Sequence, residues 1–293
     1  MNHVDEPATF HVSTETAPSR TVIAGFSQFG LAGLTAADYL VNHLSLEQTG
    51  HIRADGLPTI TPFENGRPRY PTRLFSRPDL DVTVLVGELF VPVALAEPFS
   101  RAILGWTETA GVEEVAVLSG VPFAHGPEEH RAFFVASDDY RAAHAEELAT
   151  TAVPDATAAS TNGESLDEES TEPTDESTAE TGAEATDDAT AQAAPPIPPM
   201  ANGFLDGTNA ALMARAMESA LAVAVYVTPV HAQAPDVEAA VRLVEAVDRV
   251  YDLGVDTGPL ESFAHEVGEY YRNLAERLEE HGEEEQPPDR MYM

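Results

Sequence analysis

The chain has 293 residues, of which 43% are hydrophobic, and a formal net charge of −35 from 50 acidic and 15 basic residues, the latter all arginine. This charge disfavours binding to nucleic acid or to an anionic membrane surface, because phosphate groups need basic contacts. The absence of cysteine excludes disulfides, thiolate catalysis and thiolate metal sites.

An acidic surface without lysine is typical of adaptation to a salty cytoplasm, as in halophilic archaea, where salt screens the self-repulsion. The alternative is an acidic protein of a mesophile. The first twenty residues have no basic start and no apolar run, so we expect no signal peptide. No apolar stretch reaches the roughly 20 residues that span a bilayer. We therefore expect a cytoplasmic protein.

The first half of the chain alternates between strand and helix patterns. Apolar runs at 20–26, 80–88 and 112–120 predict buried strands. Helical spacing follows the first run, with Leu34, Ala37, Leu40, Val41 and Leu44 on one stripe. A second helix is expected between the strands at 80–88 and 112–120. This alternation predicts an α/β fold built in layers.

The second half adds a helix from Thr208, its predicted cap, to Glu218, and an apolar strand at 220–227. A helix capped by Asp236 and stopped at Gly254 comes next. The last helix is expected to turn one set of apolar residues inward. These are Leu260, Phe263, Val267, Tyr270, Tyr271, Leu274 and Leu278.

Residues 142–201 are rich in Ser, Thr, Ala, Glu, Asp and Pro, and they contain no arginine and no Phe, Tyr or Trp. Such a composition buries too little apolar area to offset its ordering entropy, so this acidic insertion is predicted to be disordered. The predicted organisation has four parts. They are a flexible N-terminus (1–19), one α/β domain split into 20–141 and 202–282 that includes a C-terminal helical pair, the insertion (142–201) and a flexible tail (283–293).

A glycine-containing turn between the first strand and helix carries Gly25, Gly30 and Gly33. Such turns can hold phosphate, because a helix N-terminus offers unpaired N–H groups. The spacing is neither that of the dinucleotide fingerprint nor that of the P-loop. Close packing of the helix on the strand is the favoured interpretation, and a ligand-binding turn is the alternative.

The histidines are dispersed and show no zinc-protease pattern. His125 and His130 flank Glu128 and Glu129, which is a conceivable carboxylate–imidazole site, but a polar loop after a strand is favoured. No nucleophile elbow occurs. We therefore predict no catalytic residue, no metal site and no cofactor.

Segments in four parts of the chain resemble, in the same order, the archaeal branch of the proteasome assembly chaperone family. They read GFSQFGLAGLTAADYLVNHL, LVGELFVP, ILGWTETAGVEEVAVLSG and GFLDGTNAALMARAMESALAVAVYVTPVHAQAPDVEAAVRLVEAV. The resemblance covers about residues 20–137 and 202–280, and the acidic insertion departs from it. It implies a three-layer α/β/α fold like that of nucleoside phosphorylases without their active site, and a homo-oligomer.

The resemblance also implies a partner, the α-ring of the proteasome core particle. Activators that dock there end in a hydrophobic residue, a tyrosine and any residue, a pattern that Met291, Tyr292 and Met293 match. The terminal carboxylate is then implied to pair with a lysine in a pocket between α subunits, and the tyrosine to pack on the pocket wall and favour gate opening. The hypothesis is a non-enzymatic assembly chaperone or ATP-independent activator. A small-molecule enzyme of nucleoside-phosphorylase-like or ATP-grasp-like type, using the Gly25–Gly33 turn, is the alternative, and a scaffold that only oligomerises is a third.

Overall fold

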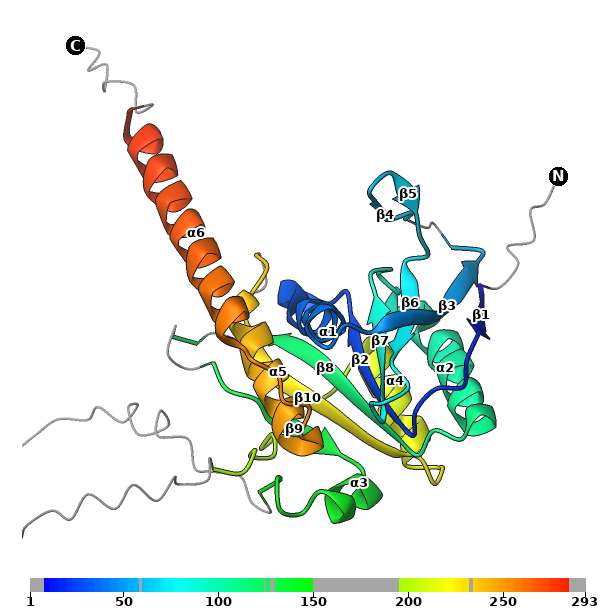
Figure 1. Ribbon diagram of the computed structural model, residues 1–293. Helices are drawn as coiled ribbons and strands as arrows, with labels where there is room; N and C mark the ends of the chain where they lie inside the picture. The colour runs from blue at the N-terminus through cyan, green and yellow to red at the C-terminus, as the bar shows by residue number, and fades with distance from the viewer. Residues whose placement is uncertain are drawn as a thin grey trace, which may run out of the picture.

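The computed structural model describes residues 8–57, 60–123, 125–126, 130–149, 195–231 and 234–284. Its centre is an eight-stranded sheet in the order β1-β3-β6-β7-β2-β8-β10-β9 (Figure 1). The strands are β1 (Thr9–Thr14), β2 (Thr21–Phe26), β3 (Glu47–Asp55), β6 (Thr72–Ser76), β7 (Val82–Gly87), β8 (Glu114–Pro122), β9 (Phe133–Ala136) and β10 (Ala222–Val230). A separate hairpin pairs β4 (Phe63–Glu64) with β5 (Arg67–Pro68).

The middle of the sheet is parallel: β7, β2, β8 and β10 run in the same direction, and antiparallel strands extend it on both sides. The carboxyl ends of these strands therefore meet at one edge of the sheet. The chain moves from β2 to β7 on one side and later returns to β8 on the other. The point between β2 and β8 is thus a topological switch point, where open α/β sheets usually bind ligands.

Helices cover both faces of the sheet, which gives two separate cores. The helices α1 (Ala32–His43) and α5 (Val237–Tyr251) pack on one face, and α2 (Ala96–Ala110) and α4 (Gly207–Ala216) on the other. Successive residues of β2 alternate between them, since Ile23 joins the first core and Val22 and Ala24 join the second. The predicted mixed α/β fold with a layered arrangement is confirmed.

The flexible N-terminus predicted for residues 1–19 is wrong for the residues that form β1. This strand pairs antiparallel with β3 over Thr9–Thr14. Phe10 is buried in the core between the sheet and α2, where its ring centroid lies 5.0 Å from that of Phe99. Burial of this one aromatic side chain explains why a short polar segment forms an edge strand.

Both ends of the predicted insertion are also structured. The helix α3 (Asp138–Ala143) leads into a segment where Ala149 N–H donates to the carbonyl of Ile197 and Ile197 N–H donates to that of Glu147, both at 2.8 Å. Leu148 and Ile197 are buried. The chain then runs beside β9, where Phe134 N–H donates to the Pro198 carbonyl and Met200 N–H to the Phe134 carbonyl. Residues 150–194 lie outside the described residues.

Two helix starts test the predicted caps. Asp236 caps α5 as predicted, since its side chain accepts a hydrogen bond from Ala239 N–H at 3.1 Å. Thr208 is not the cap of α4: the helix begins at Gly207 after Asp206, and Thr208 is buried in its first turn. The α5 helix ends at Tyr251, before the predicted stop, because Asp252 adopts a left-handed conformation with φ 49°.

The last helix, α6 (Gly258–Glu284), projects away from the body of the molecule (Figure 1). Its apolar stripe was predicted to face inward, but only Leu260 is buried and Val267 is half-buried. Phe263 and Tyr270 are 50% and 64% exposed, and Tyr271 and Leu274 are also exposed. The inward prediction is therefore wrong for these four residues in the single chain, and the side chain of Leu278 lies outside the description. None of the described helices combines the length and apolar character needed to span a membrane.

Candidate functional site

A cavity of about 730 Å³ opens at the carboxyl edge of the sheet, at the switch point. Its walls come from the turn after β2, the segment between β7 and α2, the end of β8 and the approach to α4. Two short 3-10 turns, Phe29–Leu31 and Val93–Leu95, border it. The cavity therefore occupies the position at which this class of sheet offers a binding site.

Three polar side chains meet in the cavity wall. Ser119 Oγ donates to Gln28 Oε1 at 2.8 Å, and Asn209 Nδ2 donates to Ser119 Oγ at 2.8 Å and to Gln28 Oε1 at 3.1 Å. Asn209 lies two residues after Gly207 in the first turn of α4, and the trio connects the turn after β2, the end of β8 and the start of α4. Two amides and one hydroxyl that are hydrogen-bonded to one another hold the loops in place. Neither amide of the trio is a base that could activate the Ser119 hydroxyl as a nucleophile.

The rim of the cavity is apolar and exposed. Phe90 is 66% exposed, Phe204 is 91% exposed, and Phe29 and Val93 are also exposed. Among the described lining residues there is no arginine or histidine, so the cavity presents no cationic side chain to a phosphate. Exposed aromatic side chains grouped at a hollow are typical of protein-binding surfaces.

The three glycines of the turn lie in different environments. A side chain at Gly25 would overlap the backbone of Gly33, and one at Gly33 would overlap the carbonyl of Leu118, so both allow α1 to lie close to the sheet. Gly30 lines the cavity with φ 64°, and a Cβ there would come within 2.8 Å of Val230 Cβ. The positions of Gly25 and Gly33 suit close packing. A ligand-binding role of the turn stays a prediction.

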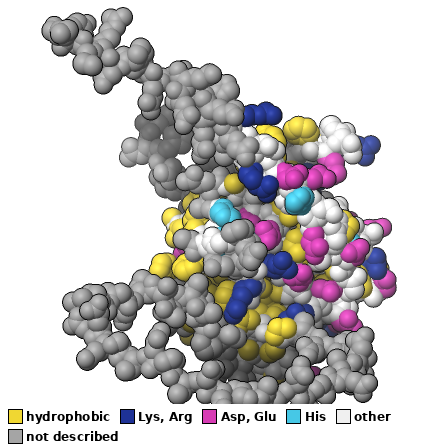
Figure 2. All heavy atoms as spheres, turned by 90° about the vertical axis from the view of Figure 1, so that its left-hand side faces the viewer, with side chains coloured by type: hydrophobic (Ala, Val, Ile, Leu, Met, Phe, Trp, Pro, Cys, Tyr) yellow, Lys and Arg dark blue, Asp and Glu magenta, His cyan; other side chains and the backbone are white. Residues whose placement is uncertain are grey.

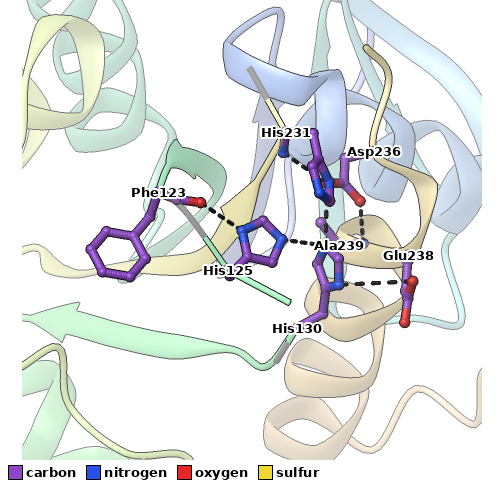
Figure 3. Close-up of polar contacts among 7 residues, drawn as sticks. All are labelled: Phe123, His125, His130, His231, Asp236, Glu238 and Ala239. Atoms are coloured by element: carbon purple, nitrogen blue, oxygen red, sulfur yellow. Dashed lines mark hydrogen bonds and ion pairs between the residues drawn. The ribbon is translucent and has the colours of Figure 1, made fainter. Parts of the chain in front are cut away.

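A second group of polar side chains gathers beside this edge, where the loops after β8 and β10 meet (Figure 3). His125 and His130 come from the first loop, and their Nε2 atoms lie 2.9 Å apart. His231 and Asp236 come from the second, with 2.8 Å between His231 Nδ1 and Asp236 Oδ2. His130 Nε2 and Asp236 Oδ2, which are 106 residues apart in the sequence, are separated by 3.2 Å.

Asp236 is the charged centre of this histidine cluster, defined as His125, His130, His231 and Asp236. Burial alone would raise the pKa of its carboxyl, but hydrogen bonds from His130, from the backbone N–H groups of His231 and Ala239, and from the His231 ring lower that pKa well below its ordinary value. A buried, ionised carboxylate at a helix start is thus surrounded by three imidazoles. Asp236 N–H also donates to the carbonyl of Gly30 at 2.7 Å, which connects the cluster to the cavity turn.

The sequence interpretation favoured a polar loop around His125 and His130, and it missed their convergence with His231 and Asp236. The available signal was topological: both loops follow parallel strands, β8 and β10, that are neighbours in the sheet. Their carboxyl ends must meet at one edge. Glu128 and Glu129, and the tail residues Met291, Tyr292 and Met293, lie outside the described residues.

Comparison with known proteins identifies the fold and the family. The model of the PAC2 family matches residues 22–275. A comparison with curated protein sequences gives no match. Two solved Pyrococcus furiosus structures are similar. PbaA, an archaeal homolog of proteasome-assembly chaperone, has a TM-score of 0.67 and 18% identity over 98% of this chain and 100% of its own. PbaB, an archaeal proteasome activator, has a TM-score of 0.66 and 14% identity over 91% and 99%.

A third similar structure, a Thermoplasma acidophilum protein of unknown function, has a TM-score of 0.61 and 20% identity over 93% of this chain and 91% of its own. At these identities the likeness to solved structures establishes the fold alone.

Proposed function

Since the chain belongs to the PAC2 family, we propose that it is a non-enzymatic adaptor of an archaeal proteasome, either an assembly chaperone or an ATP-independent activator. It docks the end of its chain into pockets of the α-ring of the core particle. The proposal is supported by two proteins of the same fold, one an archaeal homolog of proteasome-assembly chaperone and the other an archaeal proteasome activator.

The observation that carries the docking proposal is the geometry of α6. At about 1.5 Å per residue, its 27 residues extend for about 40 Å. Figure 1 shows that only its N-terminal end adjoins the body, so its C-terminal end lies far from the sheet. The C-terminal end of the helix, from which the chain continues to Met291, Tyr292 and Met293, therefore lies beyond the body of the molecule.

The chemistry of this ending suits a basic cleft. A carboxylate paired with an ammonium group in a partly desolvated pocket forms a strong charge-assisted contact. A tyrosine adds apolar area at low conformational cost. The acidic body disfavours non-specific contact with other acidic surfaces, which leaves specificity to the tail.

Self-association is the second part of the proposal. The exposed residues Phe263, Tyr270, Tyr271 and Leu274 continue the stripe that begins with buried Leu260 and half-buried Val267. A helix with such a stripe in water is expected to cover it with a partner helix, and a second copy offers a matching one. A homo-oligomer also presents several tails, whose combined binding exceeds that of one.

The test compares the intact chain with a variant lacking residues 291–293, and with Tyr292→Ala and Met291→Leu. Binding to purified core particle and stimulation of peptide hydrolysis are measured in high salt. We expect the deletion and Tyr292→Ala to weaken binding at least about ten-fold, equivalent to about 1.4 kcal/mol. Met291→Leu keeps a hydrophobic residue before the tyrosine and serves as the matched control.

Undiminished binding and stimulation by the truncated chain would contradict tail docking. If the intact chain binds the core particle but does not stimulate peptide hydrolysis, the assembly role would be favoured over the activator role.

A small-molecule enzyme is the second candidate, and the cavity at the switch point is the feature that favours it. In its described polar lining, Gln28, Ser119 and Asn209 are hydrogen-bonded to one another. These side chains suit the binding of a ligand better than general acid–base catalysis. Saturable binding of a nucleotide or phosphate that Gly30→Ala abolishes would support this candidate.

A further inference from the structure

We propose that His125, His130, His231 and Asp236 form a binding site for a divalent transition-metal ion, with zinc the best match. One ligand atom from each of the four residues lies within 4.8 Å of the others. Imidazole nitrogens and a carboxylate oxygen are ligands that zinc takes in a tetrahedral site. In a chain without cysteine, these are also the side chains available for such a site.

The distances fit a tetrahedral ion after a small adjustment. Bonds of about 2.0–2.1 Å place ligand atoms about 3.3–3.4 Å apart. Nε2 of His130 lies 2.9 Å from Nε2 of His125 and 3.2 Å from Oδ2 of Asp236. Both separations are within about 0.5 Å of the tetrahedral value. No separation in the cluster exceeds 4.8 Å, so the movement needed is at most about 1.5 Å, which an exposed imidazole such as His231 can make.

The surrounding groups orient the imidazoles toward a common point (Figure 3). His125 Nδ1 lies 2.6 Å from the carbonyl oxygen of Phe123. Because a carbonyl only accepts, the proton of neutral His125 is on Nδ1, and Nε2 directs its lone pair at the cluster. His130 Nδ1 lies 3.8 Å from a carboxylate oxygen of Glu238. A carbonyl or carboxylate behind the second nitrogen is the usual support of a metal-bound histidine.

Burial and charge also favour a cation here. The side chains of His130 and Asp236 are 2% and 4% exposed, whereas that of His231 is 58% exposed and gives an ion access from solvent. The start of α5 carries a partial positive charge that would repel a cation, but Asp236 at its cap and Glu238 in its first turn offset it. The formal charge of −35 favours cations around the whole molecule. Acidic side chains are visible on the described part of the face drawn in Figure 2.

An ion at this position would join the loop after β8 to the loop that precedes α5. Asp236 is also bonded to Gly30, so the joined loops would hold the turn that lines the cavity. The site thus goes beyond tail docking: it stabilises the edge of the sheet that carries the exposed apolar rim. None of its four proposed ligands belongs to α6.

The test uses the full chain, stripped with EDTA, dialysed into metal-free high-salt buffer and titrated calorimetrically with zinc chloride. We expect one zinc ion per chain. His125→Gln and His231→Gln change partly exposed residues and should fold; each should lower zinc affinity at least about ten-fold, and Glu238→Gln should lower it about ten-fold. His265→Gln is the control, because His265 Nε2 lies 3.5 Å from a Glu269 carboxylate on α6, away from the cluster.

Cobalt provides an independent readout, since Co²⁺ in a tetrahedral site absorbs strongly in the visible range. The intact chain and His265→Gln should show this absorption, and the double variant His125→Gln/His231→Gln should lose it. Absence of stoichiometric zinc binding would overturn the proposal. So would zinc affinity unchanged in the double variant, because the ion would then sit on surface carboxylates.

Discussion

Gly33 lies where α1 comes closest to the sheet, and the absence of a side chain there permits the approach. A Cβ at this position would overlap the carbonyl oxygen of Leu118 in β8, a backbone group that cannot move independently. Gly30, three residues earlier in the chain, lines the cavity and accepts a hydrogen bond from Asp236 N–H at its carbonyl. The close packing at Gly33 therefore lies beside both the cavity and the histidine cluster.

We predict that Gly33→Ala lowers the free energy of unfolding by about 1–3 kcal/mol or more, because the extra methyl group forces α1 away from β8. Gly105→Ala is the matched control. Gly105 lies in α2 with nothing within 4 Å of an added Cβ, so the substitution should stabilise the chain by up to about 1 kcal/mol through helix propensity. Denaturant unfolding in high salt measures both values. Equal stability of the two variants would contradict the packing argument.

The histidine cluster shows what sequence reasoning can and cannot provide at this scale. The strands that end near His125 and His231 are recognisable from their apolar runs. Their adjacency is not, because sheet order depends on which strands pair across long stretches of chain. His130 and Asp236 are 106 residues apart, and only the parallel pairing of β8 and β10 brings them together.

At the scale of elements, α6 combines a short packed part with a long exposed one. Leu260 is buried and Val267 is half-buried against the core, whereas the described side chains from Gly268 to Leu274 are exposed. Apolar periodicity predicted the helix correctly, but periodicity shows only that a face will be covered. It does not distinguish cover by the same chain from cover by a second one.

We predict that Tyr270→Glu/Leu274→Glu breaks self-association without unfolding the body, because it places charge on the exposed stripe. Light scattering in high salt should show a mass near the 31.3 kDa of one chain, with an unchanged circular dichroism spectrum. Glu266→Gln, an exposed change in the same helix, should keep the mass of the intact protein. An intact chain that is already monomeric would contradict this part of the proposal.

At the scale of the whole molecule, the two flanks of the acidic insertion are part of the fold. Leu148 and Ile197 are buried beside each other, and the Arg249 guanidinium donates to the carbonyl of Pro195. Composition suggested that the domain stops at residue 141 and resumes at 202. Two apolar residues within a polar, proline-rich context are too weak a signal to place that boundary.

Deletions that differ only in their end points test this boundary. Removing residues 151–193 should leave the melting temperature in high salt nearly unchanged, because Ala149 and Ile197 are hydrogen-bonded at 2.8 Å and a short linker can close the gap. Removing residues 142–203 should lower it markedly, since the buried pair is lost. Equal melting temperatures for the two deletions would show that the flanks contribute nothing.

The return of the chain along β9 limits how copies of the protein can meet. The segment at 198–200 occupies the outer side of Phe134, and Pro198 and Pro199 bring no N–H group that could continue a ladder. An incoming strand therefore finds this part of the edge already paired, which disfavours edge-to-edge pairing with another sheet there. Such a steric barrier does not depend on charge, so it still works in high salt, where the charges that normally keep proteins apart are screened.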